Sequence, residues 1–568
     1  MKKILLYIMT ITALFSSCDD FLDTKSYTQK NSDNFPVNEN DMFLSLVAVY
    51  SKLLPTSGEM GSTQIFCELL SDDRFGGGGS SDYSGLSIND FTIHEVNLYS
   101  NQWERLYQGI YRANYYIEQD AKAEISWSSE VIRQKYLGEA HFLRAWFLAD
   151  AVRMFGNIPM PLSTEPENLP QAAPEVVYGQ IASDIKKAIE LLPATRWPGS
   201  DSDHGHANKW AAQAFMARVF LFYTGYHGKT DIDLPEGGKV TKSDVISWID
   251  DCVDNSGYSL VPDFRNLWLY AESKDYKYTK DHNLAWVGNG KDNPEVMFAT
   301  KFSAIGNTYQ PLSSIQVLFY GWRNQNSVPF GYGWGFGTVN PQLYDEWPDD
   351  DLRKRASISY VDDKDTEGEL YYRDNQWNQM QDTRMWAKKT MPVYEWPAAG
   401  PSFNTLGYPT NGVNVSVRLW GASTGVQNNN AMDQIEIRFA DVLLMGAELG
   451  CARGQEYMDK VRTRVGLPSV PATLENIKLE RRYELAFEGL RYWDIFRWND
   501  EIETYAKINK VPCFNDGRAG HVTVRYRPEL KGLMQIPHQE IVKSNGVLKQ
   551  NEGWSENPNF DPNRVYNE

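Results

Sequence analysis

Cysteine is scarce in this chain, whose 568 residues include five. Four of them, Cys67, Cys252, Cys451 and Cys513, lie far apart, and no C-x-x-C spacing occurs. Zinc sites built from clustered cysteines are therefore not indicated. These four could form three alternative disulfide pairings outside the cell, but a chain of this length can build its core without them. We expect these four side chains to be buried free thiols.

The sequence also lacks the short motifs of several common enzyme classes. It contains no G-x-S-x-G elbow, no H-E-x-x-H helix and no G-x-x-x-x-G-K-[ST] loop. The glycines of "FGGGGSSDYSG" are not followed by Lys-Ser or Lys-Thr, so they indicate a flexible loop rather than a phosphate-binding one. His204, His206 and His227 are a weak metal candidate, because the first two lie in a loop of Ser, Asp and Gly. We predict no catalytic residue, no metal and no cofactor.

Positive charge is in deficit. The chain has 56 Lys and Arg against 74 Asp and Glu, a net charge of −18. Nucleic acids and anionic membrane surfaces attract clustered Lys and Arg, so we predict no nucleic-acid partner. A neutral ligand fits this composition better. Beyond the N-terminal segment, charges and glycines interrupt every hydrophobic stretch, so no membrane-spanning helix is expected.

The N-terminus has the layout of a secretion signal. Lys2 and Lys3 precede an apolar run over residues 4–15, which is followed by two serines and Cys18. This run is well short of the roughly 20 residues that a spanning helix needs. We predict that residues 1–17 are a signal peptide that is removed.

Cys18 stands where the apolar run ends, which resembles a bacterial lipobox, although Phe15 occupies the place where Leu is usual. An ordinary signal peptide with a chance cysteine is the alternative. The following pair, Asp19 and Asp20, resembles the surface-export signal of some Gram-negative lipoproteins. We predict lipidation of Cys18, a polar tether over residues 18–40, and a place on the outer membrane, facing outward and held by the lipid alone.

Helical periodicity begins after the tether. Apolar residues recur at spacings of three and four from Met42 to Leu53. The same pattern returns in two pairs, residues 103–120 with 136–155 and residues 176–192 with 210–223. In the last segment, alanines at helical spacing would let a second helix pack closely. We predict helical hairpins similar to tetratricopeptide units, without a regular repeat length.

The amino-acid composition changes in the second half of the chain. Residues 262–430 are rich in aromatic residues, Gly, Asn and Pro and have few periodic runs, so we expect short helices and long loops. Helical periods resume over residues 434–451 and 474–498, and Gly489 is expected to break or bend the second of these helices. The predicted divisions are a helical region over 41–261, a loop-rich binding layer over 262–430 and a C-terminal region over 431–568.

Several long segments carry a family resemblance. They are "CDDFLD", "WERLYQGIYRANYYIE", "YLGEAHFLRAWFLADAVRMFGNIPMP", "IRFADVLLMGAELGCARG", "VRTRVGLP", "LERRYELAFEGLRYWDIFRW" and "LMQIPHQEIVKSNGVLKQNEGW". In this order they resemble the motifs of the SusD/RagB family. The resemblance implies a mainly α fold, in which tetratricopeptide-like hairpins support an irregular, loop-rich ligand-binding region. It also implies a surface lipoprotein that binds glycans or other nutrients, with a SusC-like TonB-dependent outer-membrane transporter as its partner.

Aromatic residues beside hydrogen-bonding side chains are the best candidates for a glycan site, because sugars present both apolar faces and hydroxyl groups. Trp322, followed by four polar residues, is the leading candidate for an exposed stacking platform. The first group of candidates comprises Tyr309, Tyr320, Trp322, Arg323, Asn324, Gln325, Asn326, Tyr332 and Trp334. A second patch, beside the glycine run, comprises Asp73, Arg74 and Tyr83. Large aromatic residues are often core residues, so some of these rings are expected to be buried.

Two other functions stay open. A surface glycosidase would need two carboxylates in a cleft, one with a raised pKa. Glu484 and Glu488 are one turn apart, but Arg481 and Arg491 stand three residues from them, at salt-bridge spacing, which favours a structural role. A binder of peptides or of another nutrient is the second alternative.

Overall fold

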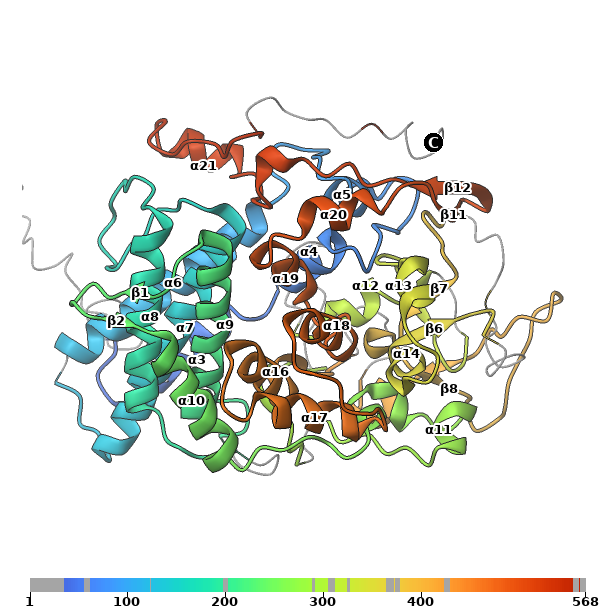
Figure 1. The fold of residues 1–568 in the computed structure, drawn as a ribbon, viewed down its shortest axis with the longest axis horizontal. Helices are drawn as coiled ribbons and strands as arrows, with labels where there is room; N and C mark the ends of the chain where they lie inside the picture. The colour runs from blue at the N-terminus through green and yellow to red at the C-terminus, as the bar shows by residue number, and fades with distance from the viewer. Residues whose placement is uncertain are drawn as a thin grey trace, which may run out of the picture.

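The structure is a computed structural model that describes residues 35–55, 62–122, 124–197, 203–288, 292–304, 312–323, 327–363, 372, 378–422, 430–554 and 561. The predicted signal peptide, Cys18 and most of the predicted tether therefore lie outside the described residues. Figure 1 shows a helical array on one side, formed by the N-terminal part of the chain, and a loop-rich layer on the other side. Helices from the C-terminal part lie between them.

The helices of the N-terminal part confirm the periodicity. Their bounds are α3 Glu39–Tyr50, α4 Thr63–Leu70, α5 Tyr83–Asn89, α6 Ser100–Lys122, α7 Glu130–Phe155, α8 Pro174–Leu191, α9 Lys209–His227 and α10 Lys242–Asn255, with a small hairpin of β1 Ile232–Asp233 and β2 Lys239–Val240. Ser129 and Asn208 cap α7 and α9 by accepting backbone N–H bonds, and Thr241 with Asp244 forms a capping box at α10.

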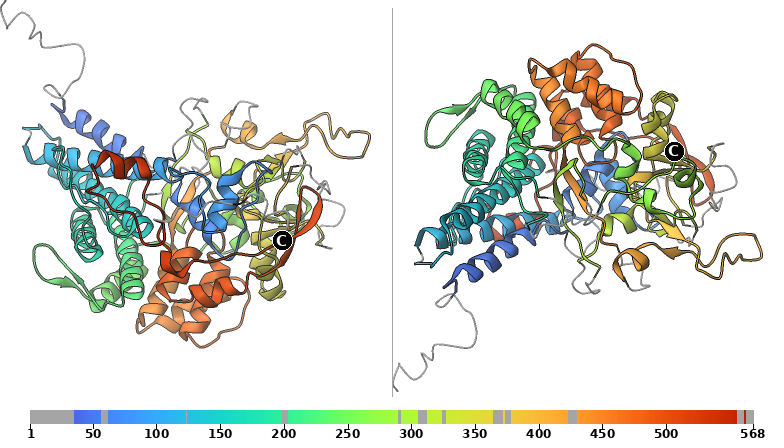
Figure 2. Two further views of the ribbon diagram at one scale, coloured as in Figure 1. Left: turned by 90° about the horizontal axis from the view of Figure 1, so that it is seen from above. Right: turned by 90° about the horizontal axis from the view of Figure 1, so that it is seen from below.

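Consecutive helices of this part pack against each other as hairpins. α6 contacts α7, α7 contacts α8, α8 contacts α9 and α9 contacts α10. Close approach depends on small residues: a Cβ added at Gly109 of α6 would lie 2.5 Å from the ring of Phe147 in α7. In α9 the alanines 211, 214 and 217 are all buried. The predicted helical hairpins are therefore confirmed, and Figure 2 shows them as one array.

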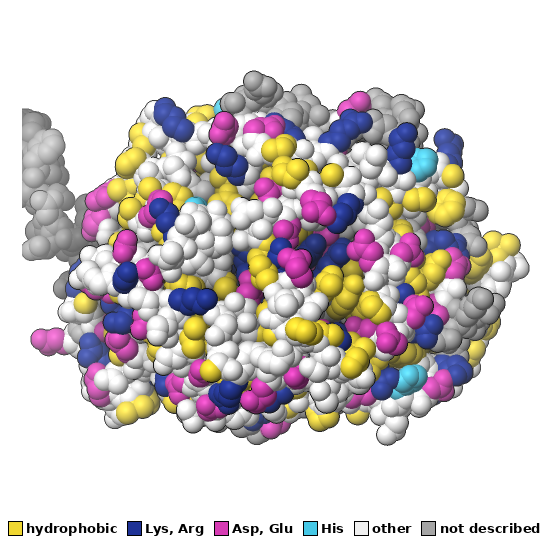
Figure 3. All heavy atoms as spheres, viewed as in Figure 1, with side chains coloured by type: hydrophobic (Ala, Val, Ile, Leu, Met, Phe, Trp, Pro, Cys, Tyr) yellow, Lys and Arg dark blue, Asp and Glu magenta, His cyan; other side chains and the backbone are white. Residues whose placement is uncertain are grey.

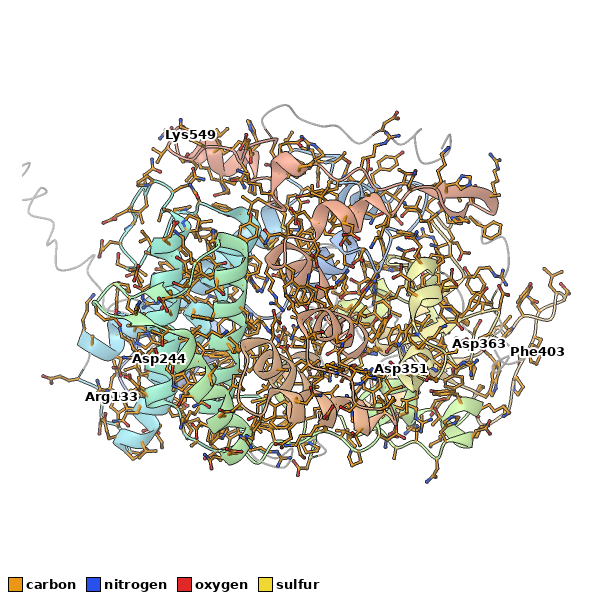
Figure 4. The ribbon with its side chains drawn as sticks, in the orientation of Figure 1. Arg133, Asp244, Asp351, Asp363, Phe403 and Lys549 are labelled. Carbon is orange, nitrogen blue, oxygen red and sulfur yellow. The ribbon has the colours of Figure 1, made fainter. Side chains whose placement is uncertain are left out.

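The loop-rich layer contains only short elements in its described residues. They are η1 Phe264–Leu267, η2 Leu269–Glu272, α11 Lys277–Asp281, β3 Val296–Thr300, α12 Ile315–Phe319, β4 Trp322–Arg323, β5 Tyr332–Gly333, α13 Pro341–Glu346, α14 Leu352–Ser357, β6 Ile358–Tyr360, β7 Met385–Ala387, η4 Lys388–Thr390, β8 Tyr394–Glu395, β9 Val413–Asn414 and α15 Ser416–Trp420. The expectation of short helices is confirmed. The hairpin between β8 and β9, where Figure 4 labels Phe403, projects from the body of the molecule.

The C-terminal part ties the two sides together. Its elements are β10 Gln434–Arg438, α16 Phe439–Leu449, α17 Gly454–Arg464, α18 Leu474–Glu484, α19 Arg491–Arg497, α20 Glu501–Ala506, β11 Val511–Asn515, β12 Arg518–Val522, η5 Pro528–Leu530 and α21 His538–Lys543. β10 pairs antiparallel with β3 of the loop-rich layer, while α16 packs against α9 and α10. The predicted break near Gly489 is confirmed, since α18 ends at Glu484 and both Phe487 and Gly489 have positive φ.

Three charged residues of α18, Glu480, Arg481 and Glu484, are buried. Glu484 is fully buried and accepts bonds from Arg353 and Arg438 at 3.0 and 2.6 Å, and it also pairs with Arg464. On the opposite side of the helix, Leu479 is 48% exposed. The structural role predicted for Glu484 is confirmed, but its partners are arginines distant in sequence rather than Arg481.

The partners of the neighbouring charges also differ from the predicted pairs. Arg481 pairs with Asp441 and Asp494 instead of Glu484. Glu488 pairs with Arg438 and Lys389, and Arg491 pairs with Asp72. The i, i+3 spacing of Glu488 and Arg491 fails because the chain between α18 and α19 is not helical.

The four cysteines of the described residues are all free and buried, as expected. None of the helices in this part of the chain is long and apolar enough to cross a membrane. On the face seen in Figure 3, Lys and Arg are interspersed with Asp and Glu rather than gathered into one patch.

Candidate functional site

The two predicted patches, about 250 residues apart in sequence, lie side by side. Single antiparallel bridges join Arg74 to Val339 and Gly77 to Phe336. Next to the second bridge, the backbone N–H of Gly78 donates to the carbonyl of Gly335 at 2.7 Å. The segment after α4 therefore forms one unit with the segment after β5.

The glycine run is a packed segment, and the expectation of a flexible loop is wrong. Residues 76–79 are buried. Gly77 has φ +66°, and a Cβ at this position would lie 2.4 Å from the carbonyl oxygen of Gly335. Glycine is needed here because two backbones touch where a side chain would stand.

Trp322 is not an exposed platform. Its side chain is fully buried and packs edge-on against Phe330 and Tyr372, with ring centroids 6.0 and 5.3 Å away. β4 pairs in parallel with β5, and Trp322 belongs to a hydrophobic core cluster that also contains Phe330 and Tyr372. The leading sequence candidate for stacking is therefore a core residue.

Tyr320, Arg74 and Asp73 are also buried, with exposed fractions of 1% or less. The guanidinium carbon of Arg74 lies 3.9 Å from the centre of the Tyr320 ring, and its Nε lies 2.8 Å from Glu68. Asp73 pairs with Arg482 of α18 at 2.8 Å. As part of this internal ion-pair network, these residues are not available to a ligand at the surface.

The remaining described candidates lie at the edge of the same unit. Tyr83 is exposed, whereas Arg323, Tyr332 and Trp334 are half-buried. Arg323 donates to the carboxylate of Asp82 at 3.1 Å and to the carbonyl of Trp334 at 2.7 Å, so it joins the two segments. We call Asp82, Tyr83, Arg323, Tyr332 and Trp334 the ledge. Tyr309, Asn324, Gln325 and Asn326 lie outside the described residues.

A pocket that the sequence did not predict lies between the helical array and the loop-rich layer. Aromatic side chains on its walls are Trp197, Tyr258, Trp268, Trp286, Phe298 and Phe487. Its polar lining includes Gln64, His204, His206, Asn293, Lys301, Gln316, Lys389, Asp433, Gln434 and Glu488. We call it the junction pocket.

The charged groups of the junction pocket are paired. The ammonium group of Lys389 lies 2.7 Å from Glu488 and 4.5 Å from the centre of the Trp268 ring, and Lys301 pairs with Asp433. Burial lowers the pKa of Lys389 to about 8 although Glu488 opposes this effect. Burial likewise raises the pKa of Asp433 against the effect of Lys301.

Amide groups cross the pocket as a short network. The side-chain amide of Gln316 donates to Gln64 at 2.9 Å and to Gln434 at 2.6 Å. These three residues come from α12, α4 and β10, so segments from all three parts of the chain meet there. Such a network can exchange hydrogen bonds with a ligand that has many hydroxyl groups.

Sequence analysis missed the tryptophans of the junction pocket. Trp197 follows α8, Trp268 lies between η1 and η2, and Trp286 follows α11, so no sequence motif connects them. A usable signal was the density of aromatic residues near residue 268, but it does not show which rings line a cavity. Their meeting depends on the packing of the loop-rich layer against the helical array.

No group of three or more His, Cys, Asp or Glu side chains within the described ranges is arranged to hold a metal ion. His206 contacts Glu139 at 2.7 Å, and His204 lies 3.3 Å from the carbonyl oxygen of Trp197. His227 packs instead against Tyr178 and Tyr223. The three histidines do not converge on one point.

Two family profiles match this chain. Residues 294–554 match the SusD family, and residues 20–221 match a family described as starch-binding and associating with the outer membrane. The chain belongs to the SusD/RagB family. The expected fold, in which helical hairpins support a loop-rich layer, is confirmed for this member of the family.

Relatives and solved structures agree with this assignment. The SusD-like protein P38 of Formosa agariphila is 24% identical, and the alignment covers 88% of this chain and 92% of that protein. A SusD-like protein of Bacteroides ovatus is 23% identical, with 88% and 83% covered. Among solved structures, a laminarin-binding SusD-like protein is 25% identical with a TM-score of 0.69, and the alignment covers 91% of this chain and 100% of that one. Surface glycan-binding protein A of Bacteroides fluxus shares the fold, with 24% identity, a TM-score of 0.70 and coverage of 91% and 100%.

Proposed function

We propose that this protein is a cell-surface glycan-binding lipoprotein that captures oligosaccharides and delivers them to a SusC-like TonB-dependent transporter. The observation that carries the proposal is the 25% identity, over 91% of the chain, with a SusD-like protein that binds laminarin. The matched family associated with the outer membrane supports the proposed location. The lipid on Cys18 and the transporter follow from the sequence and the family resemblance.

The ledge is the proposed contact surface. Tyr83 and Trp334 offer aromatic faces, and Arg323 holds the two segments in place through Asp82. A sugar ring would lie against an aromatic face and exchange hydrogen bonds with neighbouring polar groups. Binding is the whole of the activity in this proposal, because the five described residues of the ledge include no pair of free carboxylates for acid and base catalysis.

Calorimetric titration of the full chain with laminarihexaose tests the ledge. We expect Tyr83→Ala and Trp334→Ala each to weaken binding by about 1 to 3 kcal/mol, the usual loss for an aromatic stacking contact. Trp396→Ala is the matched control, because this half-buried tryptophan packs against Phe403 of the projecting hairpin. Unchanged affinity in both ledge variants, with the control also unchanged, would remove the ledge from the proposal.

Two further experiments separate the alternatives. Incubation with oligosaccharides followed by product analysis should show no cleavage, whereas shortened products would indicate a glycosidase. A panel of peptides tested against the same panel of glycans identifies a peptide binder. For the partner, affinity purification from several mild detergents should recover a large TonB-dependent transporter, and its absence from all of them would count against the pairing.

A further inference from the structure

The projecting hairpin between β8 and β9 has an uncharged, apolar tip. No charged side chain occurs from Trp396 to Val417, although charged residues make up 23% of the chain. At the tip, Phe403 is 47% exposed and Leu406 is 68% exposed. Figures 1 and 4 show that this hairpin stands out from the body of the molecule. Single exposed apolar side chains are ordinary, but a projecting apolar segment without charge is typical of an interaction site.

Hydrogen bonds within the hairpin hold the tip in shape. The side-chain oxygen of Asn404 accepts from the backbone N–H groups of Leu406 and Tyr408, both at 3.0 Å. The side-chain oxygen of Asn411 accepts from the backbone N–H of Ser402 at 2.8 Å. These bonds satisfy backbone donors that would otherwise need water. The tip can therefore enter a less polar medium without leaving these N–H groups unpaired, which would be costly.

The hairpin lies on the same side of the molecule as the first helix of the described residues, α3. Both views of Figure 2 place α3 and the hairpin toward one edge and the helices α16, α17 and α18 toward the opposite edge. On α3, Leu44 and Val47 are 45% and 43% exposed. Residues 18–34 can span at most about 60 Å when fully extended, so a lipid on Cys18 would keep α3 within that distance of the membrane.

A lipid surface is the occupant that these features favour. The net charge of −18 gives no attraction to an anionic surface, so a membrane contact has to come from apolar side chains. Such side chains can enter the boundary between headgroups and acyl chains without a pocket shaped to receive them, whereas a protein partner would need one. A contact too weak to hold a free protein becomes effective when an anchor already confines the chain to the membrane, because the effective concentration of lipid at the tip is then high.

We propose that the hairpin tip is a membrane-contact site, at which Phe403 and Leu406 enter the lipid surface while the exposed side of α3 faces the same surface. The sequence predicts attachment by the lipid on Cys18 alone, and this inference adds a contact made by the folded chain. α3 and the hairpin lie toward opposite ends of the long axis, so the two attachments would fix the orientation of the molecule, with α16, α17 and α18 facing away from the membrane. The inference rests on the lipidation that is part of the proposed function and is independent of the glycan site.

Fluorescence quenching on vesicles tests the contact. The chain without residues 1–17 is coupled through Cys18 to maleimide-bearing lipids in phosphatidylcholine vesicles, and because the other four cysteines are buried, coupling is confined to Cys18. Phe403→Trp adds a reporter at the tip, and brominated phosphatidylcholine quenches indole rings that reach the acyl chains. Leu474→Trp is the matched control, because Leu474 is 48% exposed on α18, at the opposite edge of the molecule.

We expect brominated vesicles to remove about half or more of the fluorescence that Phe403→Trp adds, and to leave that of Leu474→Trp unchanged. Leu406→Ser in the Phe403→Trp chain should lower this quenching about twofold, because the tip then loses part of its apolar surface. Leu479→Ser, at a position that is 48% exposed on α18, should not lower it. An unquenched tip, or equal quenching of the two reporters, would overturn the inference and leave a protein as the occupant of the tip.

The outcomes distinguish this inference from the proposed function. Coupling through Cys18 replaces the natural lipid, so the quenching result does not depend on lipidation in cells. If the tip is quenched and no glycan binds to the wild-type chain, glycan capture fails and the membrane contact stands. If laminarihexaose binds and the tip is unquenched, the inference alone is overturned. All four substituted side chains are exposed, and circular dichroism with thermal unfolding checks that each variant is folded.

Discussion

Replacing Glu484 by glutamine should strongly destabilise the protein. Glu484 is fully buried, and three guanidinium groups, from Arg353, Arg438 and Arg464, surround its carboxylate. The Glu484→Gln substitution keeps the size of the side chain but removes the negative charge, leaving these cations without their shared partner. Removal of one member of a buried ion pair typically costs about 3 to 5 kcal/mol, and we expect a loss of unfolding free energy in that range.

The effect should depend on pH in a defined direction. Burial opposes the ionisation of Glu484, but Arg464, Arg438 and Arg353 outweigh it and hold the pKa of this carboxyl well below its usual range. Because the folded pKa lies below the unfolded one, the contribution of this carboxylate is fully present above about pH 4.5 and is lost as pH falls through the folded pKa. The difference between wild type and Glu484→Gln should therefore be greatest near neutral pH and decrease in acid.

Urea unfolding, followed in parallel by tryptophan fluorescence and circular dichroism, measures this difference at several pH values. Glu475→Gln on the same helix is the control: its side chain is 81% exposed and lies 3.8 Å from Lys478. An exposed substitution of this kind should change stability by about 0.5 kcal/mol or less. A loss below about 1 kcal/mol for Glu484→Gln at pH 7, or an equal loss at every pH, would refute the role assigned to the buried network.

Three other predictions follow from the site and the N-terminus. Trp322→Ala should cost about 3 to 5 kcal/mol of stability, as expected for a buried aromatic residue, and a variant with an unchanged unfolding temperature would contradict its place in the core. Gly77→Ala should lower the unfolding temperature more than Gly228→Ala. Both glycines have positive φ, but only at Gly77 would the added Cβ lie 2.4 Å from a backbone oxygen, that of Gly335. Equal losses in the two variants would show that this close contact does not add to the cost. Cys18→Ala should abolish incorporation of a labelled fatty acid and release the protein from the membrane fraction, and undiminished label in this variant would argue against lipidation at Cys18.

Helices α7 and α18 differ in how much of their burial the sequence periodicity predicts. The long run of apolar and small residues in α7 marks a helix that is buried over most of its length, and the structure has it there. In α18 the same reasoning finds the helix but not the direction of its faces, because Glu480 and Glu484 are buried while Leu479 is exposed. A buried charge is stable only beside its counter-charges, and those of Glu484 come from α14, β10 and α17.

The sequence by itself determined the helical hairpins, the short elements of the loop-rich layer, the break between α18 and α19, and the family, because each depends on local periodicity or on contiguous motifs. Tertiary structure alone decided which aromatic residues can meet a ligand. Trp322 and Trp334 stand in similar glycine-containing segments, yet strand pairing buries the first and leaves the second half-exposed. The junction pocket is the clearest case, since Trp197, Trp268 and Trp286 come together only when the loop-rich layer packs against the helical array. Exposure and proximity depend on contacts between distant segments, and no local pattern encodes them.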